Sequence, residues 1–273
     1  MTIFIDWRKI AEELLRDLKN EVERNQLNLC LAGILVGDDP ALRKFVEVKK
    51  RAAQEMGAAF VLYEFPDDIN SEELTKEVLA IAKSPDNNGL VIELPLPARI
   101  NTQKVLELIP AKKDVDVLSG KMQELFYHNM PPVLPPAVEA LKIIFGNYRV
   151  NPRGKTAAIF GQGILVGKPI AHWLETNGAR VHRIDEFTQN PEQLSPGADI
   201  VIAGVGKPNF ITSSMIKTGA IVIDYGYGNE NNRLTGDVDP RVSAKAGLFT
   251  PVPGGMGPIV IAAMLKNLVE LNT

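Results

Sequence analysis

A glycine-rich stretch, TAAIFGQGILVGKP, is the strongest local sign of chemistry in this sequence. An apolar run leads into Gly161, Gln162 and Gly163, and Val166 and Gly167 follow where a helix is expected to begin. Glycines in a turn between a strand and a helix let backbone N–H groups approach a phosphate. The spacing G-x-G-x-x-x-G is one residue longer than the usual dinucleotide fingerprint. The segment could therefore form either a plain tight turn or a nucleotide-binding site.

An acidic pair, Asp185 and Glu186, follows the next expected strand, with Asp185 22 residues after Gly163. A carboxylate at that point can accept hydrogen bonds from an adenosine ribose and would repel a 2′-phosphate. Arg183 is the one counter-argument, but side chains alternate along a strand and it need not face the ribose. With no other cation evident, the pair favours NAD over NADP. A solvated acidic turn is the alternative.

Two more segments lie where the carboxyl ends of strands line a ligand crevice in an open sheet. One is Ala203-Gly204-Val205-Gly206-Lys207-Pro208, and the other is Tyr225-Gly226.

The segment 250–258 is more unusual because it holds three prolines and three glycines in nine residues. Fixed φ angles beside unhindered backbone suit a loop that lies closely against a flat ligand. The residues expected to do so are Pro253, Gly254, Gly255 and Pro258.

Phe45 and Lys49 are four positions apart in an expected helix, so they share a face. An aromatic ring with an amine one turn later can stack on a planar ring and hold a proton-transfer group beside it. A core phenylalanine with a solvated lysine is the alternative. Asp116, in the sequence KKDVD, is by default part of a solvated charge run.

The elements that must position these residues alternate between short apolar runs and amphipathic segments, which predicts parallel α/β sheets. In the first third we expect helices at 6–25, 40–56 and 71–83, the last capped by Ser71, and strands at 29–36, 58–65 and 89–97. A Pro-rich stretch within 109–136 is the best domain boundary. After it we expect helices at 135–147, 163–178 and 258–272, and strands at 156–161, 179–184, 198–204, 220–226 and 247–250.

The composition excludes several classes of protein. The 273 residues predict two modest domains or one large one, and 45% apolar with 23% charged residues argues against disorder. A net charge of −3 argues against a strongly basic nucleic-acid binder and gives no attraction to anionic membranes. The single cysteine, Cys30, and three scattered histidines provide neither a disulfide nor metal-ligand spacing. With no signal-peptide pattern or long apolar run, we expect a cytoplasmic protein.

Together these pieces resemble one family over nearly the whole chain, the bifunctional methylenetetrahydrofolate dehydrogenase/methenyltetrahydrofolate cyclohydrolases. The matching segments are VGDDPA, ELPLP, KDVD, GQGILVGKP, VGKPNFI, AIVIDYG, GDV and the highly specific TPVPGGMGP. The resemblance implies an α/β folate-binding catalytic domain, residues 1–136 and 258–273. It also implies a Rossmann-type domain with a doubly wound parallel sheet, residues 137–257, and a homodimer.

The resemblance also implies an oxidoreductase and assigns roles. A hydride passes from the methylene group of 5,10-methylenetetrahydrofolate to NAD or NADP, usually NADP in the family, and water then opens the methenyl product. Lys49 matches the lysine of a Tyr-x-x-x-Lys pair. Asp116 matches an aspartate that binds the amino and amide edge of the pterin, which a carboxylate can hold through two parallel hydrogen bonds.

The sequence departs from the family pattern at several positions, and most of these changes remove hydroxyls around the expected ligands. Phe45 replaces the tyrosine, Glu93 replaces a glutamine beside the lysine, and Gln162-Gly163 replaces Arg-Ser. Four others are Leu42 for serine, Val117 for glycine, and Leu134 and Val260 for threonines.

The change to Glu93 has a specific consequence, because an ionised carboxylate within about 4–6 Å would favour the charged form of Lys49. We therefore expect a dehydrogenase with weakened cyclohydrolase activity. The alternatives are a non-catalytic or regulatory relative that binds a nucleotide or folate, and a Rossmann oxidoreductase that acts on another small substrate.

Overall fold

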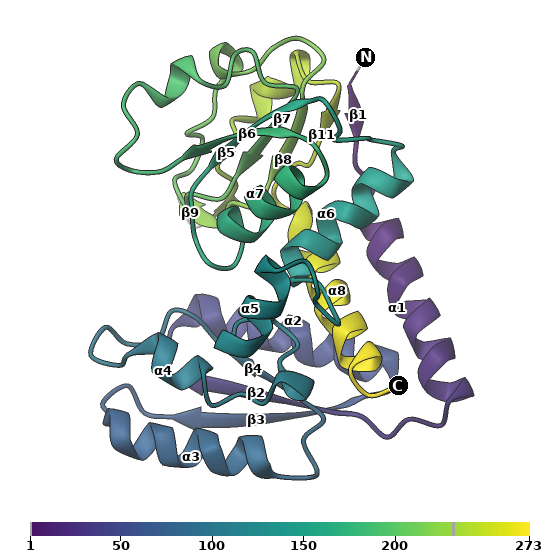
Figure 1. Cartoon of the computed structure of the whole chain (residues 1–273), viewed down its shortest axis with the longest axis vertical. Coiled ribbons are helices and arrows are strands. Elements are labelled where there is room, and N and C mark those ends of the chain that lie inside the picture. The colour runs from purple at the N-terminus through teal and green to yellow at the C-terminus, as the bar shows by residue number, and fades with distance from the viewer. Residues whose placement is uncertain (1, 231–232) are drawn as a thin grey trace. The chain divides into compact units, whose positions relative to one another are not determined.

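The computed structural model describes residues 2–230 and 233–273 and divides into two compact units. The three-strand unit comprises residues 12–136 and 261–273, and the six-strand unit comprises residues up to Ala11 and 137–260. The boundaries fall inside α1 (Trp7–Arg24) and α8 (Met256–Glu270), which Figure 1 labels. This division differs from the predicted one in the first eleven residues and in residues 258–260.

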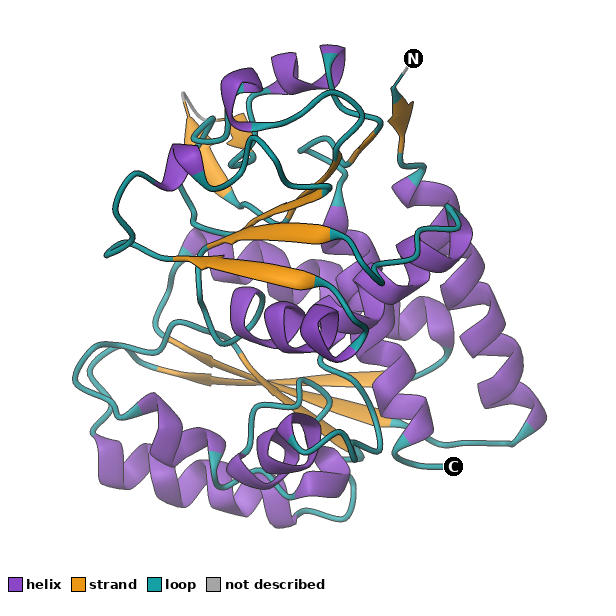
Figure 2. Ribbon diagram, turned by 45° about the horizontal axis from the view of Figure 1, so that its top comes forward, coloured by secondary structure: helices purple, strands orange, loops and turns teal. Residues whose placement is uncertain are grey.

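The three-strand unit has a parallel sheet in the order β3-β2-β4. Its strands are β2 (Cys30–Val36), β3 (Ala59–Phe65) and β4 (Gly89–Ile92). Alternate residues of β2 face opposite sides, so Leu31 packs in one apolar cluster while Ala32 and Ile34 pack in another. Helices α3 (Ser71–Lys83) and α4 (Thr102–Leu106) cover one face, and α2 (Pro40–Met56), α1 and α8 cover the other (Figures 1 and 2).

Caps and prolines set the ends of these elements. The side chain of Asp39 accepts from the backbone N–H of Ala41 at the start of α2. Helix α3 is capped by Asn70, which accepts from the N–H of Glu73, so the predicted cap Ser71 is wrong. Strand β4 stops at Ile92 rather than at residue 97, because Pro95 and Pro97 have no N–H to continue the ladder. Helix α5 (Gly120–Tyr127) lies within the predicted boundary stretch.

The six-strand unit has a wholly parallel sheet in the order β6-β5-β7-β8-β11-β1. Its strands are β1 (Ile3–Phe4), β5 (Thr156–Phe160), β6 (Arg180–Ile184), β7 (Ile200–Ala203), β8 (Ile221–Asp224) and β11 (Leu248–Phe249). The order reverses at β5, whose neighbours β6 and β7 follow it in sequence. Ligands bind beyond the carboxyl ends of strands at such a reversal. The predicted doubly wound sheet is confirmed.

The remaining elements of the six-strand unit differ in detail from the sequence prediction. Helix α7 (Gly167–Thr176) begins four residues later than expected, because residues 163–166 form the turn that precedes it. The antiparallel hairpin of β9 (Gly228–Glu230) and β10 (Arg233–Thr235) was not expected.

The other helices of the chain are α6 (Pro136–Asn147) and the short 3₁₀ helices η1 (Ala111–Lys113), η2 (Pro191–Gln193), η3 (Ser213–Met215) and η4 (Pro240–Ala244). Within the described ranges, no helix has the length and apolar character that crossing a membrane requires.

Candidate active site

An ion pair between Lys49 and Glu93 is the central feature of the three-strand unit. Lys49 lies on α2, and its Nζ donates to Glu93 Oε1 at 2.8 Å and to Oε2 at 2.9 Å. Glu93 follows β4 and its side chain is only 4% exposed, while that of Lys49 is 15% exposed. A carboxylate so poorly hydrated is stabilised chiefly by its partner. The pair therefore gives Lys49 a buried counter-charge.

Asp116 belongs to the same group of charges. Burial raises the pKa of Asp116 to about 7, and the charges of Asp114 and Glu93 add to this effect while Lys49 opposes it. Asp114 is fully buried and accepts from the backbone N–H groups of Leu118 at 3.1 Å and Ser119 at 2.6 Å. Asp114 thus fixes the turn that presents Asp116.

Three positions that depart from the family pattern lie in the same segments as these charges. Phe45 lies one turn before Lys49 on α2 and is partly buried, and Leu42 faces the core three residues earlier. Val117, where the family has glycine, has a φ of +59°. A β-branched residue rarely adopts this left-handed conformation, so the backbone retains the shape that glycine provides.

Asn267 of α8 donates to the carbonyl groups of Val115 and Leu134, each at 2.8 Å.

The six-strand unit carries the glycine turn at the end of β5. Gly161 has a φ of +90°, and a Cβ on it would lie 2.2 Å from the carbonyl oxygen of Gly204. A Cβ on Gly167 would lie 1.8 Å from the carbonyl oxygen of Gly161. Gly163 has open space around it. The first and last glycines are thus required by backbone packing, and the middle one leaves room for a ligand.

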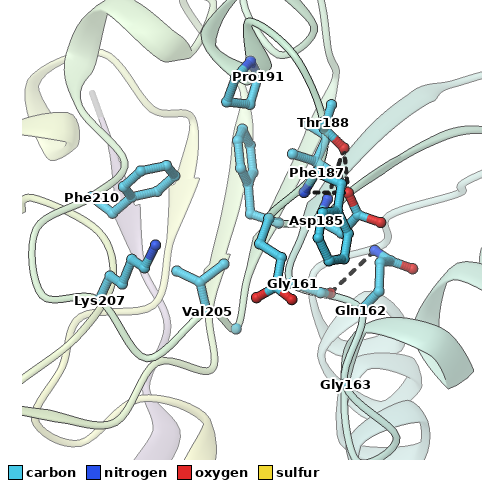
Figure 3. Close-up of a pocket in the computed structure, with 14 residues that line it drawn as sticks. Gly161, Gln162, Gly163, Asp185, Phe187, Thr188, Pro191, Val205, Lys207 and Phe210 are labelled. Atoms are coloured by element: carbon cyan, nitrogen blue, oxygen red, sulfur yellow. Dashed lines mark hydrogen bonds between the residues drawn. The ribbon is translucent and has the colours of Figure 1, made fainter.

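A cavity of about 420 Å³ opens beside this turn. In Figure 3, Val205, Lys207 and Phe210 lie on one side of the cavity, and Gln162, Asp185, Phe187 and Thr188 lie on the other. Val166 lies outside the cavity and packs against Gly204, while Pro208 packs against Gly228. Glycine backbone, carboxylates and apolar walls match what a dinucleotide needs for its pyrophosphate, ribose and rings.

The acidic turn after β6 has two different carboxylates. Asp185 Oδ1 accepts from the N–H of Phe187 at 3.1 Å and from Thr188 Oγ1 at 2.8 Å, and the Thr188 hydroxyl holds the pKa of Asp185 below its usual range. Asp185 therefore shapes the turn itself. Glu186 lines the cavity. Arg183 pairs with Glu175 at 2.7 Å and does not line the cavity, so it does not weaken the case for NAD.

One expectation about charge needs correction, because the cavity does contain a cation. Lys207 is the only lysine or arginine among the described residues that line it, and its Nζ lies 5.9 Å from the ring centroid of Phe210. Phe187, to which the sequence analysis assigned no role, also lines the cavity and is 83% exposed. Both residues follow the carboxyl end of a strand, the signal by which the sequence predicts the segment of Lys207 at the crevice and by which Phe187 could also have been found.

The Pro- and Gly-rich loop after β11 packs against the six-strand unit. Gly254 has a φ of +93°, and a Cβ on it would lie 2.4 Å from Nε1 of Trp7. A Cβ on Gly255 would lie 2.8 Å from the carbonyl oxygen of Pro251. Pro253 is exposed, and Pro258 lies in the first turn of α8. The glycines therefore make room for the chain's own indole and backbone.

Comparison with known proteins decides the family. The model for the tetrahydrofolate dehydrogenase/cyclohydrolase catalytic domain matches residues 5–116, and the model for the NAD(P)-binding domain of the same family matches residues 135–273. The chain belongs to this family.

Individual relatives agree over almost the full length. A bifunctional protein FolD from Nautilia profundicola is 40% identical, covering 99% of this chain and 96% of its own. The crystal structure of FolD from Campylobacter jejuni has a TM-score of 0.94 at 31% identity and covers 99% of this chain and 98% of its own. FolD from Trypanosoma brucei, solved with NADP cofactor and inhibitor, has a TM-score of 0.93 at 28% identity and covers 99% of this chain and 97% of its own. The family predicted from the sequence is confirmed.

Within the family, each unit holds one of the two expected groups of residues. The three-strand unit brings together Lys49, Glu93 and Asp116, and the six-strand unit brings together the glycine turn and the acidic turn. Among the residues that the structure describes, no three or more His, Cys, Asp or Glu side chains are arranged to hold a metal ion.

Proposed function

We propose that this chain oxidises 5,10-methylenetetrahydrofolate to 5,10-methenyltetrahydrofolate, with weakened hydrolysis of the methenyl product. Bound NAD or NADP supplies the hydride acceptor. The observation that carries the proposal is the Lys49–Glu93 pair beside Asp116 in a chain of the dehydrogenase/cyclohydrolase family.

Asp116 and Phe45 would bind the pterin. An ionised Asp116 can accept two parallel hydrogen bonds from the amino and amide edge of the ring. Because the pKa of Asp116 is about 7, the ionised fraction increases as the pH rises through neutrality. Phe45 offers a ring face for stacking one helical turn before Lys49.

The ion pair supports oxidation more than hydrolysis. Oxidation places a positive charge on the substrate, and Glu93 offsets the positive charge of Lys49 nearby. Hydrolysis by general-base catalysis needs a neutral amine that can take a proton from water. Two hydrogen bonds to Glu93 stabilise the ammonium form instead. Lys49 would therefore serve as an electrostatic and positioning group and act poorly as a base.

For the dinucleotide, we propose a preference for NAD. Glu186 lines the cavity at the turn where the adenosine ribose is expected, and its charge would repel a 2′-phosphate. Gln162 donates to the carbonyl groups of Ile159 and Gly161, both at 3.1 Å, so its side chain is folded onto the turn. Lys207 lies on the opposite side of the cavity and is suited to the pyrophosphate charge.

The decisive experiment is a spectrophotometric assay with methylenetetrahydrofolate and, in turn, NAD and NADP. The proposal expects formation of methenyltetrahydrofolate with a higher kcat/KM for NAD, and slow hydrolysis of added methenyltetrahydrofolate. No oxidation with either dinucleotide would overturn the dehydrogenase, and a higher kcat/KM with NADP would overturn the NAD preference. The homodimer and the cytoplasmic location stay predictions, and light scattering in solution would test the first.

A further inference from the structure

Two buried aspartates lie behind one wall of the dinucleotide cavity. Asp224 ends β8 and is 1% exposed, and Asp237 follows β10 and is fully buried. Neither lines the cavity. Buried carboxylates are costly unless their oxygens are hydrogen-bonded, so their partners indicate what each one does.

Asp237 binds both ends of the loop 204–211, which connects β7 to the rest of the unit. Its Oδ2 accepts from the backbone N–H groups of Val205 at 2.6 Å and Gly206 at 3.1 Å. Its backbone carbonyl accepts from the N–H of Ile211 at 2.9 Å. The loop supplies four residues that line the cavity: Gly204, Val205, Lys207 and Phe210.

Asp224 fixes the position of Asp237 in turn. Asp224 Oδ1 accepts from the N–H groups of Gly226 at 2.7 Å and Asp237 at 3.2 Å, and its Oδ2 accepts from Val238 at 3.0 Å. These bonds attach the segment that carries Asp237 to the end of a central strand. The wall of the cavity is thus linked to the sheet through two carboxylates.

The backbone of Gly226 limits the space beside the Asp237 side chain. A Cβ on Gly226 would lie 2.4 Å from Asp237 Cγ and 2.6 Å from its Oδ1, the oxygen that has no hydrogen-bond partner among the described residues. The carboxylate is thus held against bare backbone on one side and against two amide donors on the other. Any side chain at residue 226 must displace it.

We propose that Asp237 is a positioning residue for the dinucleotide, holding the loop 204–211 in its binding shape through Val205 and Gly206. The inference rests on the proposed dinucleotide site in the six-strand unit. Charge-assisted bonds to two backbone amides are stronger than neutral ones, so the loop depends on an acceptor at this point. An amide oxygen can replace the carboxylate, whereas a methyl group cannot.

The test compares Asp237→Ala with Asp237→Asn in the full chain by titration with the preferred dinucleotide and, separately, with tetrahydrofolate. We expect Asp237→Ala to raise the dinucleotide Kd about tenfold or more, the effect of losing about one strong hydrogen bond, while the tetrahydrofolate Kd is unchanged. Asp237→Asn should restore most of the affinity. Gly226→Ala should resemble Asp237→Ala, and Asp239→Ala, a nearby buried aspartate paired with Arg241, should resemble the wild type.

Hydrogen exchange supplies a readout that a general loss of stability would not give. In Asp237→Ala the amides of Val205 and Gly206 should exchange faster while those of β7 stay protected. An unchanged dinucleotide Kd in Asp237→Ala overturns the proposal, as does a parallel loss of tetrahydrofolate binding and of protection in β7. If the wild type itself binds neither NAD nor NADP, the proposed dinucleotide function fails instead.

Discussion

Lys49 Nζ donates to both carboxylate oxygens of Glu93, at 2.8 Å and 2.9 Å, from helix α2 to the end of strand β4. A glutamine at residue 93 could accept only one such bond and would carry no charge. The carboxylate therefore changes the charge of the lysine's surroundings without changing the shape of the site. This single difference places a charged partner, in place of a neutral amide, against Lys49.

Replacing Glu93 should increase hydrolysis. In Glu93→Gln, loss of the counter-charge makes the neutral amine of Lys49 more accessible, so we expect the rate of methenyltetrahydrofolate hydrolysis to rise about tenfold or more, the lower range of general-base effects. The measurement is the decay of methenyl absorbance at fixed pH. Dehydrogenase kcat should change less.

A matched control is Glu139→Gln, which also removes a buried glutamate paired with a lysine, here Lys142 at 3.2 Å. It should leave hydrolysis unchanged. Equal hydrolysis by the wild type and Glu93→Gln would show that the carboxylate does not restrain Lys49.

The pKa of Asp116, about 7, predicts a pH-dependent KM for the folate. The ionised carboxylate binds the pterin edge, and it forms as the pH rises through about 7, so KM should fall about tenfold between roughly pH 6 and pH 8. Asp116→Asn should have a higher KM without this step. In Glu93→Gln the midpoint should move to lower pH, because the Glu93 charge is one cause of the raised pKa. A step that persists in Asp116→Asn would assign it to another group.

Hydrophobic periodicity and turn residues predicted most of the fold. Gly57 ends α2 where expected, and the alternation of β and α segments gave both parallel sheets. Strand β1 escaped prediction because two residues, Ile3 and Phe4, carry no period, and it is formed only by pairing with β11 from the far end of the chain. Asn70 and Ser71 are adjacent and both residue types cap helices equally well, so the sequence alone does not distinguish them.

The site could be predicted residue by residue but not as an arrangement. Lys49 and Glu93 are 44 positions apart, and the family resemblance, not the residue pattern of either segment, predicts that they lie side by side. Asp185 and Glu186 are adjacent acids with no difference in sequence context, and only the turn geometry gives the first a structural role. Lys207 lies in a segment that the sequence predicts at the crevice, but the sequence does not indicate that its charge faces the cavity. Long-range packing brings Lys49 to Glu93, whereas local turn geometry distinguishes Asp185 from Glu186.

Glu186 and Asp185 should therefore respond differently to neutralisation. Glu186→Gln removes a charge at the expected ribose position, so we expect the KM for NADP to fall about tenfold while the KM for NAD rises slightly, since like charges brought together cost several kcal/mol. Asp185→Asn loosens the turn and should weaken both dinucleotides alike. Initial rates with each dinucleotide measure both effects. An unchanged ratio of the NADP and NAD kcat/KM values in Glu186→Gln would show that other residues determine the dinucleotide preference.

Substitutions of Gly161 and Gly163, in the turn after β5, should differ in their effect on stability. In Gly161→Ala the added Cβ meets the carbonyl oxygen of Gly204 at 2.2 Å in a left-handed backbone, which should cost about 2–5 kcal/mol of unfolding free energy and raise the dinucleotide Kd. Gly163→Ala adds the same methyl group in open space and serves as the matched control, with a free energy of unfolding within about 1 kcal/mol of the wild type. Urea unfolding measures the difference. Equal stability of the two variants would mean that the backbone at residue 161 can relax, and the close approach to Gly204 would then not be what requires glycine there.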